Sequence, residues 1–260
     1  MTAPLRISLV QSELAWEDRR ANLRQFDEKL TLLQEGQTDL LVLPEMFTTG
    51  FSMNAPQLAE PTEGEAYHWM AKQADRLQAV VTGSIIAEEE GKYYNRLLWV
   101  RPDGSYEQYD KRHLFTLAKE ELTYSPGQEA LLVELKGWKV MPLVCYDLRF
   151  PVWSRNRYEY DLLLYVANWP AKRRVAWNTL LPARAVENQA YTIGLNRVGE
   201  DGNGYPHAGD SSVYDFAGAS LLQAAEVEGV FSVALDKSKQ ENFREKLRFL
   251  ADRDTFTIKL

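Results

Sequence analysis

Cysteine, histidine and long hydrophobic runs are scarce in this sequence of 260 residues. It has a single cysteine, Cys145, so no disulfide can form within the chain, and such usage is typical of a reducing compartment. Residues 1–6 lack the basic and then apolar order of a signal peptide. The longest apolar run, at residues 162–167, is far shorter than the roughly 20 residues of a membrane helix. These absences predict a cytoplasmic protein without membrane spans.

Basic clusters are lacking as well. The formal net charge is −7 and no segment is rich in lysine and arginine, so neither nucleic acid nor an anionic membrane surface is an expected partner. Hydrophobic residues make up 45% of the chain and charged residues 26%, as in a globular protein, and no linker-like composition interrupts them. We therefore expect residues 1–260 to form one domain.

The hydrophobic pattern predicts alternating strands and helices. Apolar residues at steps of three and four predict a helix over residues 18–34. Thr62, with Glu65 three residues later, forms a capping box that predicts the start of a second helix. A third, over residues 172–189, contains Pro182, which should bend it or divide it in two. Strands are predicted at residues 5–10, 39–43, 79–87, 93–100 and 161–167, among others.

The single cysteine follows an apolar run that is typical of a buried strand. Pro151 could open a helix over residues 152–158. Cys145 would then lie on a sharp strand-to-helix turn that resembles a nucleophile elbow, where free backbone N–H groups face the atom under attack. A lone cysteine is commonly just a small buried hydrophobe, so catalysis requires partners.

Histidine is the usual partner of a catalytic cysteine, and the chain has three. His68 falls on a predicted amphipathic helix and His207 in a turn-rich loop. His113 is the best candidate for a papain-like Cys–His pair, but the neighbouring Lys111 suggests another arrangement.

Three segments taken together resemble the motifs of the nitrilase, or carbon–nitrogen hydrolase, superfamily. They are Leu-Leu-Val-Leu-Pro-Glu-Met-Phe at residues 40–47, Tyr-Asp-Lys-Arg-His-Leu-Phe at 109–115 and Val-Cys-Tyr-Asp-Leu-Arg-Phe at 144–150. In that superfamily Glu, Lys and Cys form the catalytic triad in this chain order, so the resemblance implies Glu45, Lys111 and Cys145. It also implies a second glutamate upstream of a Pro-Gly pair, for which Glu120 is favoured over Glu121.

The resemblance implies an α/β fold, a four-layer α-β-β-α sandwich, with a plain doubly wound sheet as the competing architecture. Glu45 would be the general base, and Lys111 and the Tyr146 N–H would stabilise the oxyanion. Glu120 would orient Lys111 or relay a proton. Neither a metal nor a cofactor is required.

The Cys-Tyr-Asp sequence is similar to the amidase branch of the superfamily rather than to its nitrilases. The chain as a whole resembles bacterial ω-amidases, which implies a small-molecule amide substrate such as 2-oxoglutaramate or 2-oxosuccinamate. Residues predicted to contact such a substrate are Phe51, His113, Tyr146, Trp169 and Arg173.

The substrate carboxylate needs a cationic or N–H-rich receptor, and Arg173, Arg174 and Arg197 are candidates. A nitrilase, an N-carbamoyl-amino-acid amidohydrolase and a non-catalytic binding protein on the same fold remain alternatives. The resemblance also suggests a homodimer formed through the helices that flank the cysteine turn.

Overall fold

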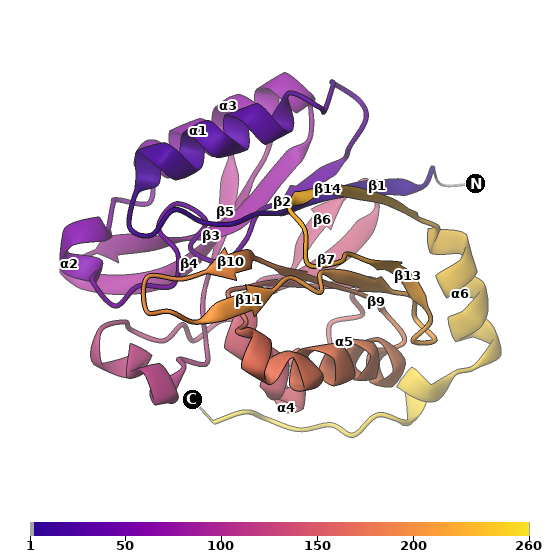
Figure 1. Cartoon of the computed structure of the whole chain (residues 1–260). Coiled ribbons are helices and arrows are strands. Elements are labelled where there is room, and N and C mark those ends of the chain that lie inside the picture. Colours follow the sequence, from indigo (N-terminus) through magenta and orange to yellow (C-terminus); the bar gives the residue numbers. More distant parts are fainter. Residues whose placement is uncertain (1–2, 260) are drawn as a thin grey trace.

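The computed structural model describes residues 3–259. It contains two six-stranded sheets and one two-stranded sheet (Figure 1). The first sheet has the strand order β14-β1-β2-β3-β4-β5, the second has the order β13-β12-β9-β8-β7-β6, and β10 pairs with β11. The strands are β1 (Leu5–Gln11), β2 (Leu40–Val42), β3 (Val80–Glu89), β4 (Lys92–Val100), β5 (Tyr106–Asp110), β6 (Val133–Leu135), β7 (Trp138–Val144), β8 (Leu162–Ala167), β9 (Tyr191–Asn196), β10 (Val198–Glu200), β11 (Pro206–Ala208), β12 (Ser212–Tyr214), β13 (Ser220–Gln223) and β14 (Gly229–Leu235).

Helices cover the outer faces of the two large sheets (Figure 1). The α-helices are α1 (Arg19–Leu30), α2 (Ala55–Leu58), α3 (Glu65–Leu77), α4 (Pro151–Ser154), α5 (Arg174–Asn188) and α6 (Lys237–Lys246). The 3₁₀ turns are η1 (Thr116–Ala118), η2 (Glu120–Leu122), η3 (Cys145–Arg149), η4 (Ala171–Arg173) and η5 (Phe249–Asp252). Helices α1 and α3 pack on the first sheet, and α5 packs on the second. The predicted four-layer α-β-β-α sandwich is confirmed, and the alternative of one doubly wound sheet is wrong.

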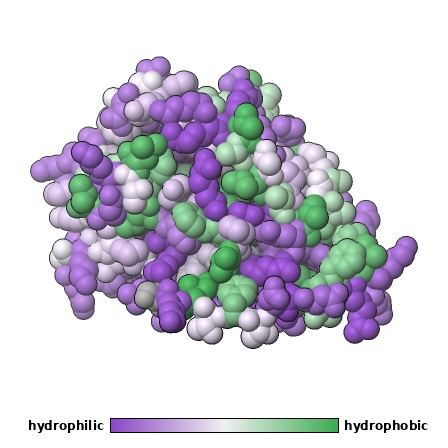
Figure 2. All heavy atoms as spheres, turned by 90° about the horizontal axis from the view of Figure 1, so that it is seen from below, coloured by the Kyte–Doolittle hydropathy of each residue, from purple (hydrophilic) through white to green (hydrophobic). Residues whose placement is uncertain are grey.

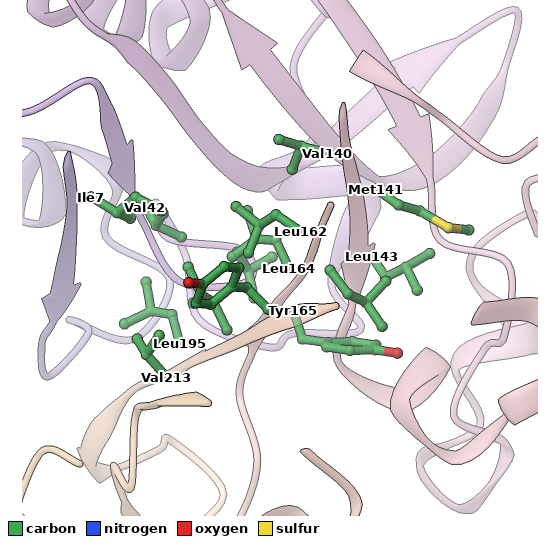
Figure 3. Packing of buried hydrophobic residues seen from close by; sticks show 14 of the residues in the cluster. Ile7, Val42, Val140, Met141, Leu143, Leu162, Leu164, Tyr165, Leu195 and Val213 are labelled. Atoms are coloured by element: carbon green, nitrogen blue, oxygen red, sulfur yellow. The ribbon is translucent and has the colours of Figure 1, made fainter. Parts of the chain in front are cut away.

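The main core lies between the two sheets. Successive residues of a strand point to opposite faces, so in β2 Leu40 and Val42 enter the layer between the sheets while Leu41 packs under the helices. Figure 3 shows Val42 of the first sheet approaching Leu162 and Leu164 of the second. A strand buried on both faces explains why the sequence of this segment is a continuous apolar run rather than an alternating one.

One detail of the predicted helices is wrong. Helix α3 begins after Gly64, which has no side chain to cap it, and the Thr62 hydroxyl instead accepts a hydrogen bond from Arg96 at 2.6 Å. The cap comes from outside the helix, since the Ala66 N–H donates to the Glu60 carboxylate at 3.0 Å. Helix α5 continues through Pro182 without being divided.

Parallel strand pairing brings the ends of several strands to one edge of the sandwich. In the first sheet β1, β2 and β3 run parallel, and in the second β7, β8 and β9 do so. The carboxyl end of β2 leads to Glu45, that of β7 to Cys145, and that of β8 to Asn168. Ligand sites of α/β proteins lie outside such carboxyl ends, so the fold itself assembles these residues into a candidate site.

Within residues 3–259, no helix combines the length and the apolar character that crossing a membrane would demand.

A small ion cluster joins the two sheets at their other edge. The Asp39 carboxylate accepts hydrogen bonds from the Arg6 backbone N–H at 2.8 Å and from the Arg6 guanidinium at 2.8 and 3.1 Å. It also binds the ammonium of Lys136, which lies in the turn between β6 and β7 of the second sheet. Burial by itself would raise the pKa of Asp39, but these hydrogen bonds outweigh it and lower the pKa to about 2.

We expect Asp39→Asn to lower the free energy of unfolding by about 1–2 kcal/mol at pH 7, because part of the pairing is exposed to solvent. The folded-state pKa of Asp39 lies below the unfolded value of about 3.9, so the unfolded chain binds more protons in between. The stabilisation is therefore complete above about pH 5 and falls to about half by pH 3. Urea unfolding of both proteins at pH 7, 5 and 3 measures this difference.

Glu35→Gln, at an exposed position, is the matched control for removal of one negative charge. A difference between wild type and Asp39→Asn that is the same at pH 3 and pH 7 would contradict the assignment.

Candidate active site

Cys145 occupies a strained turn directly after β7. Its φ angle is 45°, in the left-handed region that non-glycine residues seldom adopt, and the residue opens the 3₁₀ turn η3. The turn is fastened by Asp147, whose carboxylate accepts the Val144 N–H at 3.0 Å. The predicted helix after the cysteine is correspondingly short, since α4 has only four residues. The turn leaves the N–H groups of its first residues, including Tyr146, without helical acceptors.

A buried ammonium lies between two buried carboxylates beside this turn. Lys111 Nζ is 2.9 Å from Glu45 Oε1 and 3.0 Å from each carboxylate oxygen of Glu120. All three side chains are at most 1% exposed. Glu121, the alternative to Glu120, is exposed to solvent. The structure thus brings Glu45, Lys111 and Glu120 together with Cys145, although they come from distant parts of the chain.

The environment determines which of these groups carry protons. Burial raises the pKa of the Cys145 thiol well above its ordinary value, the neighbouring Glu45 carboxylate raises it further, and Lys111 opposes them only in part. Burial disfavours the charged form of Lys111, but Glu120 and Glu45 outweigh it and raise the pKa of the ammonium. The resting site therefore holds a protonated thiol and a cationic lysine. Glu45 is among the groups that raise the pKa of the thiol, and a neighbouring carboxylate of this kind can act as the base that removes the thiol proton.

The second glutamate has a different environment. Burial is the largest influence and raises the pKa of Glu120, while Lys111 acts in the opposite direction. Its carboxylate also accepts the Phe115 N–H at 2.5 Å. The Glu120 carboxylate is thus held both by the Lys111 ammonium and by the Phe115 N–H.

Two asparagines that the motifs did not reveal complete the site. Asn95 donates its side-chain N–H groups to Glu45 at 2.8 Å and to Glu120 at 3.3 Å. The Asn168 backbone N–H donates to Glu45 Oε2 at 2.8 Å, and its side chain donates to the Glu45 carbonyl. Asn95 lies in the middle of β4, where asparagine is unfavourable, and this is the signal by which the sequence could have indicated it.

A cavity of about 520 Å³ opens onto Cys145. Four of the five residues predicted to contact substrate line it, namely Phe51, Tyr146, Trp169 and Arg173. Phe51 also lies 5.1 Å below the Lys111 ammonium in a cation–π contact.

His113, the fifth residue predicted to contact substrate, is absent from the residues that line this cavity. Its Nδ1 is 2.7 Å from the Asp147 carboxylate, while the charged groups that influence the Cys145 thiol are Glu45, Lys111 and Glu120. These contacts argue against a papain-like Cys–His pair.

The three arginines suggested as carboxylate receptors have separate environments. Arg173 lines the cavity, with its guanidinium 4.8 Å from the Phe115 ring. Arg174 is held by Asp210 at 2.8 and 2.9 Å. Arg197 is fully buried and donates to backbone carbonyls, and burial lowers its pKa to about 10. Only Arg173 therefore faces the space in which a ligand would lie.

Two further cations at the cavity were not anticipated. Arg149 lies 4.9 Å from the Trp169 ring, and Lys172 lies 4.0 Å from the Tyr205 ring. Across residues 3–259, neither these two nor Arg173 forms an ion pair with a carboxylate. The cavity also has acidic walls at Glu17 and Asp201.

No cluster of three or more His, Cys, Asp or Glu side chains suited to a metal ion occurs in the part of the chain that the structure describes. The chemistry that the arrangement offers is acyl transfer. A thiol with an adjacent carboxylate base can attack a carbonyl carbon, and an ammonium with a free backbone N–H can stabilise the oxyanion that forms.

Comparisons with known proteins agree with this chemistry. The family model for "Carbon-nitrogen hydrolase" matches residues 6–245. Omega-amidase YafV of Yersinia enterocolitica is 47% identical over 255 residues, which cover 98% of each chain. The 2-oxoglutaramate amidase of Bacillus subtilis is 32% identical, with 95% of this chain and 96% of the relative covered.

One solved structure has nearly the same fold. A CN-hydrolase superfamily protein from Xanthomonas campestris, which carries an arsenic adduct in its active site, has a TM-score of 0.96 and 45% sequence identity. The comparison covers 98% of this chain and 99% of that one. The family model and both relatives span almost the whole chain, and we conclude that this protein belongs to the carbon–nitrogen hydrolase family.

Proposed function

We propose that this protein hydrolyses the terminal amide of 2-oxo dicarboxylic acid monoamides, such as 2-oxoglutaramate and 2-oxosuccinamate, to the acid and ammonia. The observation that supports this most directly is the composition of the cavity, which is lined both by the buried thiol with its charged partners and by three cations that form no ion pair with a carboxylate. An amide that carries a carboxylate matches both groups of residues. The names of the two relatives, an omega-amidase and a 2-oxoglutaramate amidase, support the same substrate class.

In the first half of the reaction, Glu45 accepts the thiol proton of Cys145 as the sulfur attacks the amide carbon. The carbonyl oxygen becomes an oxyanion, which Lys111 Nζ and the Tyr146 N–H stabilise. Each such donor contributes on the order of 3 kcal/mol to transition-state stabilisation. Glu45 then returns the proton to the nitrogen, the C–N bond breaks, and ammonia leaves a thioester on Cys145.

In the second half, water attacks the thioester carbon while Glu45 accepts one of its protons. A second oxyanion forms at the same donors, the C–S bond breaks, and the sulfur recovers its proton. Glu120 and Asn95 keep Lys111 and Glu45 in place throughout, because both residues contact these groups directly.

The three cations in the cavity would receive the substrate carboxylate. Arg173 is the foremost of them, because it lines the same cavity as Cys145, and partial burial lowers the pKa of its guanidinium. A partly buried cation without a carboxylate partner is stabilised when an anionic ligand binds beside it. A guanidinium can also bind a carboxylate through two parallel hydrogen bonds.

Replacing the nucleophile tests the reaction. We expect Cys145→Ala to release ammonia from 2-oxoglutaramate at least roughly 10³-fold more slowly than wild type, since the thioester cannot form. Mass spectrometry should detect an acyl adduct on wild type and none on the variant.

A panel with a nitrile and an N-carbamoyl amino acid separates the alternative hydrolases, and a higher kcat/KM for either of these compounds would contradict the proposed substrate. A wild-type protein that is inert toward all of them, and whose thiol resists alkylation at neutral pH, would instead indicate a binding protein.

Removing the foremost cation tests the substrate class. We expect Arg173→Gln to lower kcat/KM for 2-oxoglutaramate by roughly 10- to 100-fold, the value of one charge-assisted contact, and to change kcat/KM for an uncharged aliphatic amide by less than about threefold. Steady-state kinetics with both amides measures the two ratios. Arg174→Gln is the matched control, because Arg174 is already paired with Asp210. An equal loss for the charged and the uncharged amide would exclude carboxylate recognition by Arg173.

We also infer a homodimer that uses the outer face of α4 and α5. Val152 on α4 is 55% exposed, and Val175 and Val186 on α5 are 77% and 54% exposed. Figure 2 looks onto the side of the molecule where α4 and α5 lie and shows apolar areas among polar ones. Apolar side chains on one such face are typical of a surface that a second copy covers.

A charge on this face should prevent that association. We expect Val175→Asp to shift the protein from dimer to monomer in sedimentation velocity at micromolar concentration, because a carboxylate would be buried without a partner. Leu32→Asp, at an equally exposed apolar position after α1, should leave the dimer intact. A monomeric wild type would refute the dimer.

A further inference from the structure

Asp147 is a fully buried carboxylate that accepts four hydrogen bonds from two different segments. The Val144 N–H, at 3.0 Å, belongs to the cysteine turn. The Tyr109 hydroxyl at 2.8 Å, the His113 N–H at 3.0 Å and the His113 ring Nδ1 at 2.7 Å belong to the segment that carries Lys111. One carboxylate therefore fastens the lysine segment to the cysteine turn.

Residues on both sides of Lys111 in the chain bind Asp147. Tyr109 lies two residues before Lys111 and His113 two residues after it, so both flanks of the lysine are tied to the same carboxylate. In the cysteine turn, Asp147 lies two residues after Cys145, and its carboxylate accepts the N–H of Val144, the residue before the cysteine. The oxyanion donors, Lys111 Nζ and the Tyr146 N–H, come from these two segments, so the distance between them depends on this connection.

The His113 ring is held in one orientation. It stacks on Phe150 with ring centroids 3.7 Å apart and planes within 3°, and Trp153 meets it edge-on at 6.1 Å. Within residues 3–259, His113 is the one basic side chain that pairs with Asp147, since neither lysine nor arginine forms an ion pair with that carboxylate. A buried carboxylate is stable only when its oxygens accept hydrogen bonds. His113 supplies two of the four donors to Asp147.

We propose that His113 is a positioning residue for the acyl-transfer reaction, which acts through Asp147 to align Lys111 with the cysteine turn. This inference rests on the proposed function, because it assumes that Lys111 and Cys145 act on the same carbonyl group. His113 itself exchanges no proton with the substrate. Its contribution lies in the Nδ1 hydrogen bond, while the stack on Phe150 sets the plane of the ring.

Two substitutions separate the hydrogen bond from the stack. His113→Phe keeps a ring on Phe150 and loses the donor, whereas His113→Asn keeps an N–H at the same number of bonds from the backbone and loses the ring. We expect His113→Phe to lower kcat on 2-oxoglutaramate by roughly 10- to 100-fold with KM within about threefold, since a displacement on the order of 1 Å has an effect of this size. We expect His113→Asn to retain kcat within about threefold.

A second measurement does not depend on the substrate. The rate at which iodoacetamide alkylates Cys145 should fall in His113→Phe and recover in His113→Asn, because the position of the thiol relative to Glu45 and Lys111 controls its ionisation. Thermal unfolding confirms that each variant is folded, and His68→Phe, at an exposed histidine on α3, is the matched control.

The outcomes are distinct. Unchanged kcat and alkylation in folded His113→Phe overturn the proposal, as does a His113→Asn variant that is as impaired as His113→Phe. A loss of roughly 10³-fold or more in both variants would overturn it in favour of His113 as a general base. If wild type reacts with iodoacetamide but hydrolyses none of the amides, the substrate assignment fails while the alkylation rates still test the positioning role.

Discussion

The Lys111 ammonium, buried between the carboxylates of Glu45 and Glu120, is the interaction on which the site depends. Removing an ammonium and two carboxylates from water is costly unless each is paired and hydrogen-bonded. The structure meets this condition with donors from several elements, including Asn95 of β4, the Phe115 N–H and the Asn168 N–H. Removing any one partner would leave a buried charge uncompensated, and for this reason the two sheets and the loop after Lys111 must hold their relative positions.

The sandwich supplies those positions from both of its halves. Glu45 and Lys111 follow strands of the first sheet, whereas Cys145 and Asn168 follow strands of the second. The core between the sheets is made of side chains from both, so the distance between the nucleophile and its base is a property of the packing. At the opposite edge, the cluster around Asp39 joins the sheets again.

The sequence indicated much of this arrangement, and its omissions have physical reasons. Residues whose chemistry is unusual for their local setting could be recognised, such as Glu45 after an apolar strand or a lone cysteine at a turn. The contacts of Asn95 and the partner of His113 could not be predicted, because they join segments that are 25 to 50 residues apart in the chain, although an asparagine inside a strand marks Asn95 itself as unusual. The start of α3 was misplaced for a similar reason, since its cap is the side chain of Glu60, outside the local capping pattern.

The two carboxylates beside the thiol also influence how the reaction ends. Hydrolysis of an amide replaces a neutral group with an anion at the point where Glu45 and Glu120 already share one ammonium. Three negative groups then lie around one buried ammonium, and like charges repel most strongly in buried surroundings. This repulsion weakens the binding of the acid, so the same electrostatics that prepare the attack also favour release of the product.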